Sequence, residues 1–382
     1  MKIAIMAPLV TAIREPQRGG SQAFVSDLAR GLTGRGHEVH VYAASGSEIP
    51  GVEVIDTGVD PRSLAGTLYR AFGPSGPSGP SGPAGPSGPA GAAGTRRPEP
   101  ATAEAAFARA YQSVQEIRYD VIHNHAFDAP AVRLATALQA PVVHTLHLPP
   151  DGAVAAALRH AARSGRAPTV AAVSVFQGSA WRRVVRVDAV LPPYVPTRVI
   201  PWSRAAGDGA VFAGRLSPEK GAAEAIDIAR AAGVPIEVYG DVYDAEYSRE
   251  QIGPRRAWPG VTVHEAVPRT SLWAAMARAA VVLFPARWDE PFGMAAAEAQ
   301  ACGTPVVAFR RGALSEVIVD GVTGFLVPTD DISAAVDAVG RTAEISRSAC
   351  REHAEGRLDL ERSLDAHERL YRQVVSPGAD GG

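Results

Sequence analysis

Apolar strand-like and helix-like segments alternate along this chain from its first residues. Residues 2–7 form a short apolar run, apolar side chains recur at helical spacing between Phe24 and Leu32, and residues 38–43 (EVHVYA) are strand-like again. A strand, a helix and a strand this close together require a parallel pair joined by a right-handed crossover. The chain is therefore predicted to be α/β, with parallel sheets.

The same alternation runs in two series, separated by a proline cluster at residues 192–201. A length of 382 residues exceeds what one hydrophobic core usually supports. We therefore expect two facing Rossmann-like domains with a ligand cleft at the carboxyl ends of their strands. The expected division is residues 1–195, residues 196–357, a C-terminal helix at 358–375 that crosses back to the first domain, and a disordered tail at 376–382.

The individual elements follow from the same periodicity. In the first series, strands are expected at 120–123, 141–145 and 169–174, and a helix at 101–115. In the second series, strands are expected at 210–213, 236–239, 261–264, 281–284 and 306–309, with helices at 222–232, 270–279 and 294–301.

Residues 73–94 carry glycine at every third position (GPSGPSGPSGPAGPSGPAGAAG). This resembles collagen, but the segment is far too short and isolated to form a stable triple helix. A solvated Gly/Pro-rich insertion is favoured over a binding role. A structural role would require self-association that is lost when the segment is deleted.

Charge, cysteine content and hydropathy exclude several kinds of partner and structural site. The net charge of −2 offers no footprint for nucleic acid. Cys302 and Cys350 cannot form a disulfide framework or a cysteine-rich zinc site, which fits a reduced cytoplasmic protein. The apolar N-terminus contains Pro8 and lacks a basic region, so it reads as a buried strand rather than a signal peptide. No apolar run is long enough to span a bilayer, while shallow association with a membrane surface stays open.

The most informative stretch is residues 284–307, FPARWDEPFGMAAAEAQACGTPVV. Glu290 lies in the loop after a strand, and Glu298 lies within the helix that follows Gly293. The first N–H groups of that helix are expected to be free for hydroxyl or phosphate oxygens. One carboxylate then suits a hexose and the other a ribose diol, since carboxylates accept hydroxyl hydrogen bonds and repel phosphate. Taken singly, Glu290 is better explained as an ordinary charge at a helix start and Glu298 as an exposed surface glutamate.

Residues 213–221 (AGRLSPEKG) form the second candidate element. Ser217 and Pro218 read as an N-cap and a first helical residue, which puts Lys220 in the first helical turn. A cation there opposes the helix dipole unless an anion is bound. Together with the planar fork of Arg215, Lys220 can neutralise a diphosphate leaving group without a metal. The alternative is that Glu219 and solvent satisfy Lys220.

Two further features lie after strands of the first series. Gly19 and Gly20 precede the first helix and allow close approach of a ligand, although neither a GxGxxG nor a P-loop pattern is present. Histidines follow two strands in pairs, and their spacing allows zinc ligation, but no third kind of ligand clusters with them. A hydrogen-bonding role toward substrate is favoured for His125, and structural roles are favoured for His123 and His144. The paired histidines are His123, His125, His144 and His147.

Together these motifs resemble the retaining glycosyltransferases of family 4, which have the GT-B fold. The family's E-x7-E signature stands at Glu290–Glu298, and its Gly-Arg…Lys-Gly element stands at Gly214-Arg215…Lys220-Gly221. Residues 312–327 also fit, although Ala313 replaces the usual second glycine after Gly312, and the Gly/Pro-rich insertion is not a family feature.

The resemblance implies roles for particular residues. Arg215 and Lys220 would hold the donor diphosphate, assisted by the Gly19–Gly20 backbone and by Gly214. Glu290 and the amides of Phe292, Gly293 and Met294 would bind the transferred sugar, Glu298 the ribose, and His125 would sit beside the sugar and the attacking hydroxyl. Catalytic roles are thus expected for His125, Arg215, Lys220 and Glu290.

The reaction implied is metal-independent transfer with same-face attack, from a UDP-sugar before a GDP-sugar, to an acceptor hydroxyl, with no cofactor beyond the donor. The alternatives are a GT-B phosphorylase or epimerase, and a catalytically silent nucleotide-sugar-binding protein. The sequence does not identify the acceptor.

Overall fold

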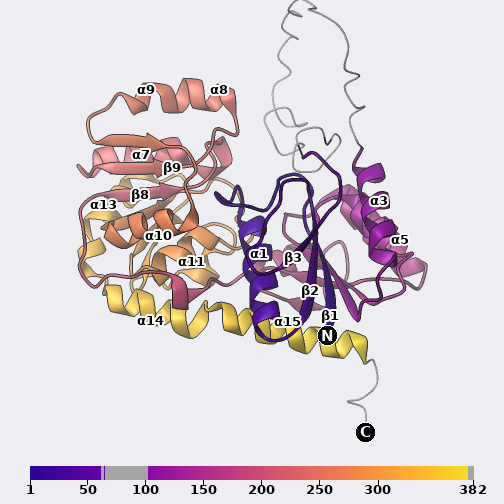
Figure 1. Cartoon of the computed structure of the whole chain (residues 1–382). Helices are drawn as coiled ribbons and strands as arrows, with labels where there is room; N and C mark the ends of the chain where they lie inside the picture. The colour runs from indigo at the N-terminus through magenta and orange to yellow at the C-terminus, as the bar shows by residue number, and fades with distance from the viewer. Residues whose placement is uncertain (62–63, 65–101, 377–382) are drawn as a thin grey trace, which may run out of the picture.

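The computed structural model describes residues 1–61, 64 and 102–376. It contains two α/β units side by side, each built on one sheet whose strands all pair in parallel (Figure 1). The predicted fold class, two Rossmann-like domains with parallel sheets, is confirmed. The predicted insertion at 73–94 lies outside the described residues, as does all of the expected tail except Ser376.

The first sheet has seven strands in the order β3-β2-β1-β4-β5-β6-β7. Its strands are β1 (Lys2–Met6), β2 (Glu38–Ala43), β3 (Glu53–Asp56), β4 (Val121–Asn124), β5 (Val142–Leu146), β6 (Thr169–Ala172) and β7 (Ala189–Val190). Its helices are α1 (Gly20–Gly34), α3 (Ala103–Gln115), α4 (Ala129–Ala135), α5 (Gly152–Arg163) and α6 (Val175–Arg182).

The second sheet has six strands in the order β10-β9-β8-β11-β12-β13. Its strands are β8 (Ala210–Ala213), β9 (Ile236–Tyr239), β10 (Val261–His264), β11 (Val281–Phe284), β12 (Val306–Phe309) and β13 (Gly324–Val327). Its helices are α7 (Ala222–Ala231), α8 (Ala245–Tyr247), α9 (Gly253–Arg256), α10 (Arg269–Arg278), α11 (Met294–Ala301), α12 (Leu314–Val317), α13 (Ile332–Gly340) and α14 (Arg347–Arg357). Short turns of 3₁₀ helix lie at Thr197–Val199, Pro218–Lys220 and Thr342–Glu344, and a π-helical turn at Ser248–Ile252.

Each sheet reverses its strand order once, between β1 and β4 in the first and between β8 and β11 in the second. In open parallel sheets, ligands bind in the crevice outside the carboxyl ends of the strands at such a reversal. The loops that follow β1, β4, β8 and β11 are therefore where a site is expected.

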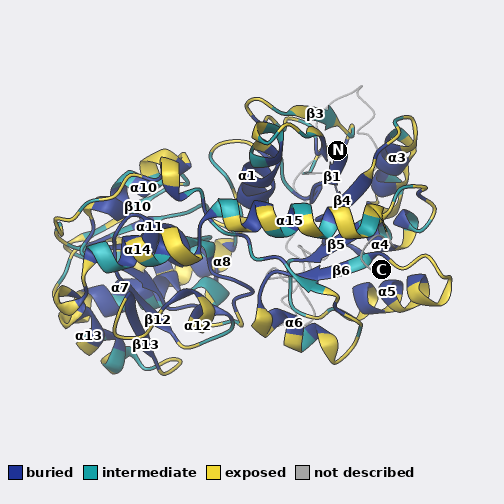
Figure 2. Cartoon of the chain, turned by 90° about the horizontal axis from the view of Figure 1, so that it is seen from below, coloured by how far each residue is buried: buried dark blue, intermediate teal, exposed yellow. Residues whose placement is uncertain are grey.

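Alternating side chains of each central strand supply two cores. In β1, Ile3 and Ile5 pack in the cluster with α1, whereas Ala4 and Met6 pack in the cluster with α3. This is the two-residue period of a strand that is covered by helices on both faces. Figure 2 shows the central strands of both units as buried and the outer faces of the helices as exposed.

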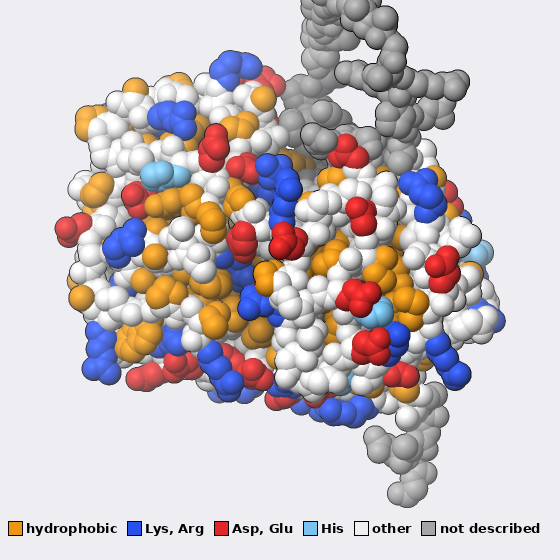
Figure 3. Space-filling view, in the orientation of Figure 1, with side chains coloured by type: hydrophobic (Ala, Val, Ile, Leu, Met, Phe, Trp, Pro, Cys, Tyr) orange, Lys and Arg blue, Asp and Glu red, His pale blue; other side chains and the backbone are white. Residues whose placement is uncertain are grey.

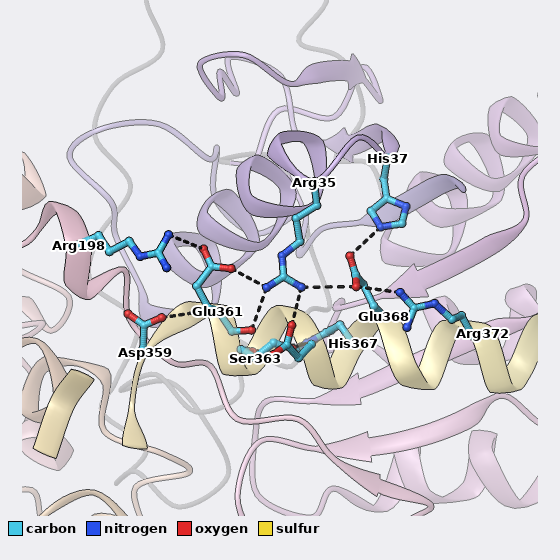
Figure 4. Close-up of polar contacts among 10 residues, drawn as sticks. Arg35, His37, Arg198, Asp359, Glu361, Ser363, His367, Glu368 and Arg372 are labelled. Atoms are coloured by element: carbon cyan, nitrogen blue, oxygen red, sulfur yellow. Dashed lines mark hydrogen bonds and ion pairs between the residues drawn. The ribbon is translucent and has the colours of Figure 1, made fainter. Parts of the chain in front are cut away.

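The last helix, α15 (Leu360–Val375), returns to the first unit and packs against α1. Arg35, which follows α1, bonds the carboxylates of Glu361 and Asp365 at 2.5 and 2.8 Å (Figure 4). Glu368 in turn bonds His37 at 2.9 Å. Where the chain crosses, Val195 pairs with the segment before α15, accepting from the N–H of Leu360. The expected boundary at 195/196 thus falls where two chain segments cross, and it stays a prediction.

Several expected elements differ at their ends. The helix expected from residue 358 begins at Leu360, because the Asp359 side chain accepts the N–H of Glu361 and acts as the N-cap. Ser217 makes no capping bond: Pro218–Lys220 is a 3₁₀ turn, and α7 begins only after Gly221. Strands β3, β7 and β13 were not expected; β7 has only two residues, and β3 (EVID) has an acidic residue at each end. Within the described residues, no helix combines the length and apolarity needed to cross a membrane.

Candidate active site

The predicted residues of the second domain come from the two loops at its strand-order reversal. Gly214, Arg215 and Lys220 follow β8, and Glu290 follows β11. The Lys220 ammonium donates to Glu290 Oε2 at 2.8 Å, and the Trp288 indole N–H donates to the same oxygen at 2.6 Å. Lys220 also lies 4.7 Å from the Trp288 ring centroid. The two motifs that lie 70 residues apart in sequence thus form one contact.

Glu290 is buried, with only 8% of its surface exposed. Its Oε1, in contrast to Oε2, has no hydrogen-bond partner among the described residues. One oxygen is therefore held by Lys220 and Trp288, and the other can accept a hydroxyl. Trp288 was not predicted from the sequence.

Arg215 is paired with its own loop. Its guanidinium bonds Glu219 Oε1 at 3.1 Å and lies 4.4 Å from the Tyr243 ring centroid. Glu219 therefore neutralises Arg215, not Lys220, which corrects the alternative considered for Lys220. A bound phosphate would have to compete with Glu219 for this arginine.

The start of α11 is shaped by two glycines. Gly293, the N-cap residue, has φ +99°, a left-handed conformation that favours glycine. Gly312 has φ +60°, and a Cβ there would lie 2.3 Å from the Glu290 backbone nitrogen. Ala313, where the family usually has a second glycine, has φ −82° and donates its N–H to the Glu290 carbonyl, so an alanine fits. These contacts hold Glu290 and Phe292–Met294 beside each other.

The first domain meets this helix through the predicted glycine pair. A Cβ on Gly20 would lie 3.2 Å from Met294 Sδ, so the start of α1 touches the start of α11. Gly19 is the N-cap of α1 and has no side chain to cap it. The predicted Gly20 of the first domain thus lies beside the predicted Met294 of the second, at the interface between the domains.

Glu298 lies in this interface in a buried ion pair that the sequence did not predict. Arg269, the first residue of α10, donates to Glu298 Oε1 from Nε and Nη2 at 3.1 and 2.8 Å. Its Nη1 bonds both carboxylate oxygens of Asp27 on α1, at 3.0 and 2.8 Å. Glu298 Oε2 has no partner among the described residues. An arginine at a helix start, where the dipole disfavours a cation, was the available signal.

A second contact between the domains involves Glu316 of α12. Its two carboxylate oxygens accept the N–H groups of Val175 and Phe176, the first residues of α6, at 2.8 and 2.7 Å. Arg18 and Asp241 form an exposed pair across the same boundary at 3.1 Å. Figure 3 shows acidic and basic side chains gathered side by side near the line where the two domains meet.

His125 lies after β4 at the reversal of the first sheet, as predicted, but it is fully buried. Its Nδ1 hydrogen-bonds His147 Nε2 at 2.9 Å, and its Nε2 is buried without a partner within the described residues. Burial, reinforced by neighbouring histidines, lowers the pKa of His125 well below its usual value. It is therefore a neutral imidazole.

His123 has a structural role, as expected. Its ring nitrogens bond the Tyr371 hydroxyl of α15 at 2.6 Å and the Thr145 hydroxyl at 2.7 Å. His144 is buried at 1% exposure, and burial lowers its pKa to about 4. Among the described residues, no group of three or more histidine, cysteine or acidic side chains is arranged to hold a metal ion.

A cavity of about 360 Å³ lies at the opposite edge of the second sheet, beside the amino ends of β8, β9 and β10. Asp208, Pro235 and Arg278 line it. None of the predicted site residues does, so it is separate from the site described above.

Two family models match the chain. One, described as Glycosyltransferase Family 4, matches residues 18–199, and the other, Glycosyl transferases group 1, matches residues 208–356. A D-inositol 3-phosphate glycosyltransferase of Kribbella flavida is 29% identical over 88% of this chain and 87% of the relative. That of Saccharomonospora viridis is 44% identical over 106 residues, which cover 26% of this chain and 24% of the relative.

Two solved structures share the fold over nearly all of the chain. AviGT4, a glycosyltransferase involved in avilamycin A biosynthesis, superposes with a TM-score of 0.68 at 19% identity, covering 99% of both chains. Anabaena HepE in complex with UDP and glucose superposes with a TM-score of 0.69 at 20% identity, covering 97% of this chain and 99% of the other. The two-domain arrangement is thus the GT-B fold, as predicted.

Proposed function

Because the chain belongs to glycosyltransferase family 4, we propose that it transfers a sugar from a nucleoside-diphosphate sugar to an acceptor hydroxyl, with retention and without a metal. The observation that carries this proposal is the Lys220–Glu290 contact at the strand-order reversal of the second sheet. It unites a cation for the leaving diphosphate and a carboxylate for the sugar in one place.

The proposed division of labour follows from charge. Lys220 and Arg215 stabilise the negative charge that develops on the departing diphosphate, a task that otherwise falls to a metal ion. Both cations have acidic partners here, Glu290 and Glu219. Donor binding would therefore exchange these partners for phosphate. Before the donor binds, Glu290 and Glu219 hold the two cations in position.

The roles proposed for Glu290 and Glu298 rest on the one oxygen of each carboxylate that has no hydrogen-bond partner among the described residues. Glu290 Oε1 would accept a hydroxyl of the transferred sugar, and Glu298 Oε2 a ribose hydroxyl. The amides of Phe292, Gly293 and Met294 would support the sugar, and Gly19 and Gly20 leave room for the diphosphate. In the transfer, the bond from the anomeric carbon to the diphosphate oxygen breaks and a bond to the acceptor oxygen forms on the same face. The acceptor's proton passes to the departing phosphate.

His125 is proposed to act beside the sugar as a neutral hydrogen-bonding group. Its unpaired Nε2 supports this role, because a buried polar atom without a partner costs free energy unless a ligand satisfies it. The lowered pKa argues against a charged imidazole there.

UDP is our first proposal for the donor nucleotide and GDP the second; the UDP bound to HepE supports that order. The acceptor panel should include D-inositol 3-phosphate, which the names of the relatives suggest. A cytoplasmic location and shallow membrane contact stay predictions.

Thermal shift with free UDP, GDP, ADP and dTDP tests the donor site. A ligand at a hundred times its dissociation constant stabilises the folded state by about 2.7 kcal/mol. One nucleotide should raise the melting temperature of the wild type and of Glu352→Ala, which removes an exposed glutamate of α14, but not of Glu298→Ala. Release of that diphosphate from its sugar on adding acceptor, unchanged by EDTA, would then support metal-independent transfer. A wild type that none of the four stabilises, or that requires a metal, would contradict the proposal.

A further inference from the structure

Arg269 occupies a position that helix electrostatics disfavours. It is the first residue of α10, where the helix dipole repels a cation, and its side chain is only 10% exposed. Burying a guanidinium there is costly unless carboxylates surround it. Two do, and they belong to different domains: Asp27 on α1 and Glu298 on α11.

The guanidinium nitrogens of Arg269 donate hydrogen bonds to both partners. Nη1 donates to both oxygens of Asp27, while Nε and Nη2 both donate to Oε1 of Glu298. The guanidinium carbon also lies 4.7 Å from the Trp273 ring centroid, which fixes the plane of the fork. Glu298 therefore cannot rotate without breaking two hydrogen bonds, and its Oε2 is left in a defined place.

Arg269 makes a second contact with the first domain, in addition to Asp27. The backbone N–H of Arg269 donates to the Glu15 side chain at 3.0 Å. The bond from the N–H and the two bonds from Nη1 to the first domain must break if the domains separate, whereas the bonds to Glu298 need not. The arrangement seen here thus exists only while the domains touch.

One carboxylate oxygen of this buried cluster can accept a hydrogen bond from a ligand. Asp27 and Glu298 bring two negative charges against one positive charge, and burial raises the pKa of Asp27 despite Arg269. Oε2 of Glu298 still lacks a partner within the described residues. A pair of neighbouring hydroxyls would satisfy it without adding charge.

We propose that Arg269 is a positioning residue for donor recognition. It holds Glu298 so that Oε2 receives the ribose diol of the donor nucleotide, and through Asp27 it makes this arrangement depend on contact between the two domains. This inference rests on the proposed function, since it assigns a support to the nucleotide-binding carboxylate of that site.

The test measures discrimination at the ribose. Calorimetry gives dissociation constants for UDP and 2′-deoxy-UDP, and for GDP and 2′-deoxy-GDP if thermal shift identifies guanine. A hydrogen bond to a charged group corresponds to roughly a tenfold to hundredfold preference for the ribose form. The wild type should show that preference. Arg269→Gln should bind UDP at least about tenfold more weakly and lose most of the preference.

The matched control is Arg278→Gln, which removes an arginine from the other, exposed end of α10. It should keep both the affinity and the preference. Asp27→Asn should weaken UDP binding although Asp27 is not assigned a contact with the donor. If Arg269→Gln fails to fold, Arg269→Lys takes its place, because a single ammonium cannot serve both carboxylates as a guanidinium does.

The outcomes separate this inference from the proposed function. A folded Arg269 variant with the wild-type ratio of UDP to 2′-deoxy-UDP affinity, or an Asp27→Asn variant with wild-type UDP affinity, overturns the inference while the donor site stands. A wild type that binds none of UDP, GDP, ADP and dTDP overturns the proposed function itself.

Discussion

At the scale of single residues, Lys220 stands out from the composition of the chain. Of 38 lysine and arginine residues, only Lys2 and Lys220 are lysine. A chain that uses arginine almost everywhere has an ammonium where it meets Glu290 and the Trp288 ring. A compact point charge on a flexible stem fits where a planar fork would not, and this preference is a signal that sequence alone offers.

We predict that Lys220→Ala lowers kcat by about 10²–10³-fold, the usual cost of removing one preorganised charge from a reacting centre. Lys2→Ala is the matched control, because it removes the only other lysine, from a partly exposed pair with Glu38 at the amino end of β1. Transfer assays with circular dichroism on both variants check this. An unchanged kcat in folded Lys220→Ala would remove Lys220 from the site.

The spacing of Glu290 and Glu298 in the sequence identified both carboxylates as candidates. It could not show that one oxygen of each is hydrogen-bonded within the protein. The partners, Lys220 and Arg269, come from other loops and depend on how the strands are ordered.

At the scale of elements, the contact between α12 and α6 links the domains through backbone groups. The first N–H groups of a helix lack partners within it, and the Glu316 carboxylate of the other domain supplies them for α6. Ser174 caps the same helix by accepting the N–H of Gln177. Together they satisfy the start of α6 only while the domains are in contact.

Glu316→Gln should therefore speed hydrogen exchange at the amides of Val175 and Phe176 and lower stability by about 1 kcal/mol, as loss of a charged cap does. Glu352→Gln, an exposed glutamate of α14, is the control and should change neither. Exchange measured by mass spectrometry on peptides spanning α6 gives the result. Protection of these amides equal to that of the wild type would show that the contact is dispensable.

At the scale of the whole molecule, buried neutral histidines tie stability to pH. Burial lowers the pKa of His144 and of His367 to about 4, below the ordinary value near 6.5. Between these values the unfolded chain takes up a proton that the folded chain excludes. Each such histidine therefore stabilises the fold above pH 6.5 and loses about 1.4 kcal/mol of that contribution per pH unit as pH falls toward 4.

The free energy of unfolding, measured in urea, should therefore fall between pH 6.5 and 4.5. His367→Gln should reduce the slope of this free energy against pH by about 1.4 kcal/mol per pH unit, the value for one proton. His160→Gln, an exposed histidine of α5, should leave the slope unchanged. His367 lies on α15, the helix that returns to the first domain, and its ring packs near that of His123 in that domain. The same slope in His367→Gln and in the wild type would contradict this reading.

Local pattern was enough for the periodic parts of the chain. The strands expected at 210–213, 236–239, 261–264, 281–284 and 306–309 have those bounds in the structure, because a short apolar run between turn residues is determined by neighbours in sequence. The parallel α/β class follows from their alternation with helices. The motifs at Arg215–Lys220 and Glu290–Glu298 could be found in the same way.

Tertiary structure alone decided which of these side chains meet. Arg269, Asp27 and Glu298 come from three helices in two domains, and Glu316 reaches α6 across the boundary. No local period encodes such contacts, since they depend on strand order and on the return of α15 to α1. The sequence therefore determined which chemical groups are present and on which elements they lie, whereas packing of the two domains determined which charges are paired and which oxygens remain open to a ligand.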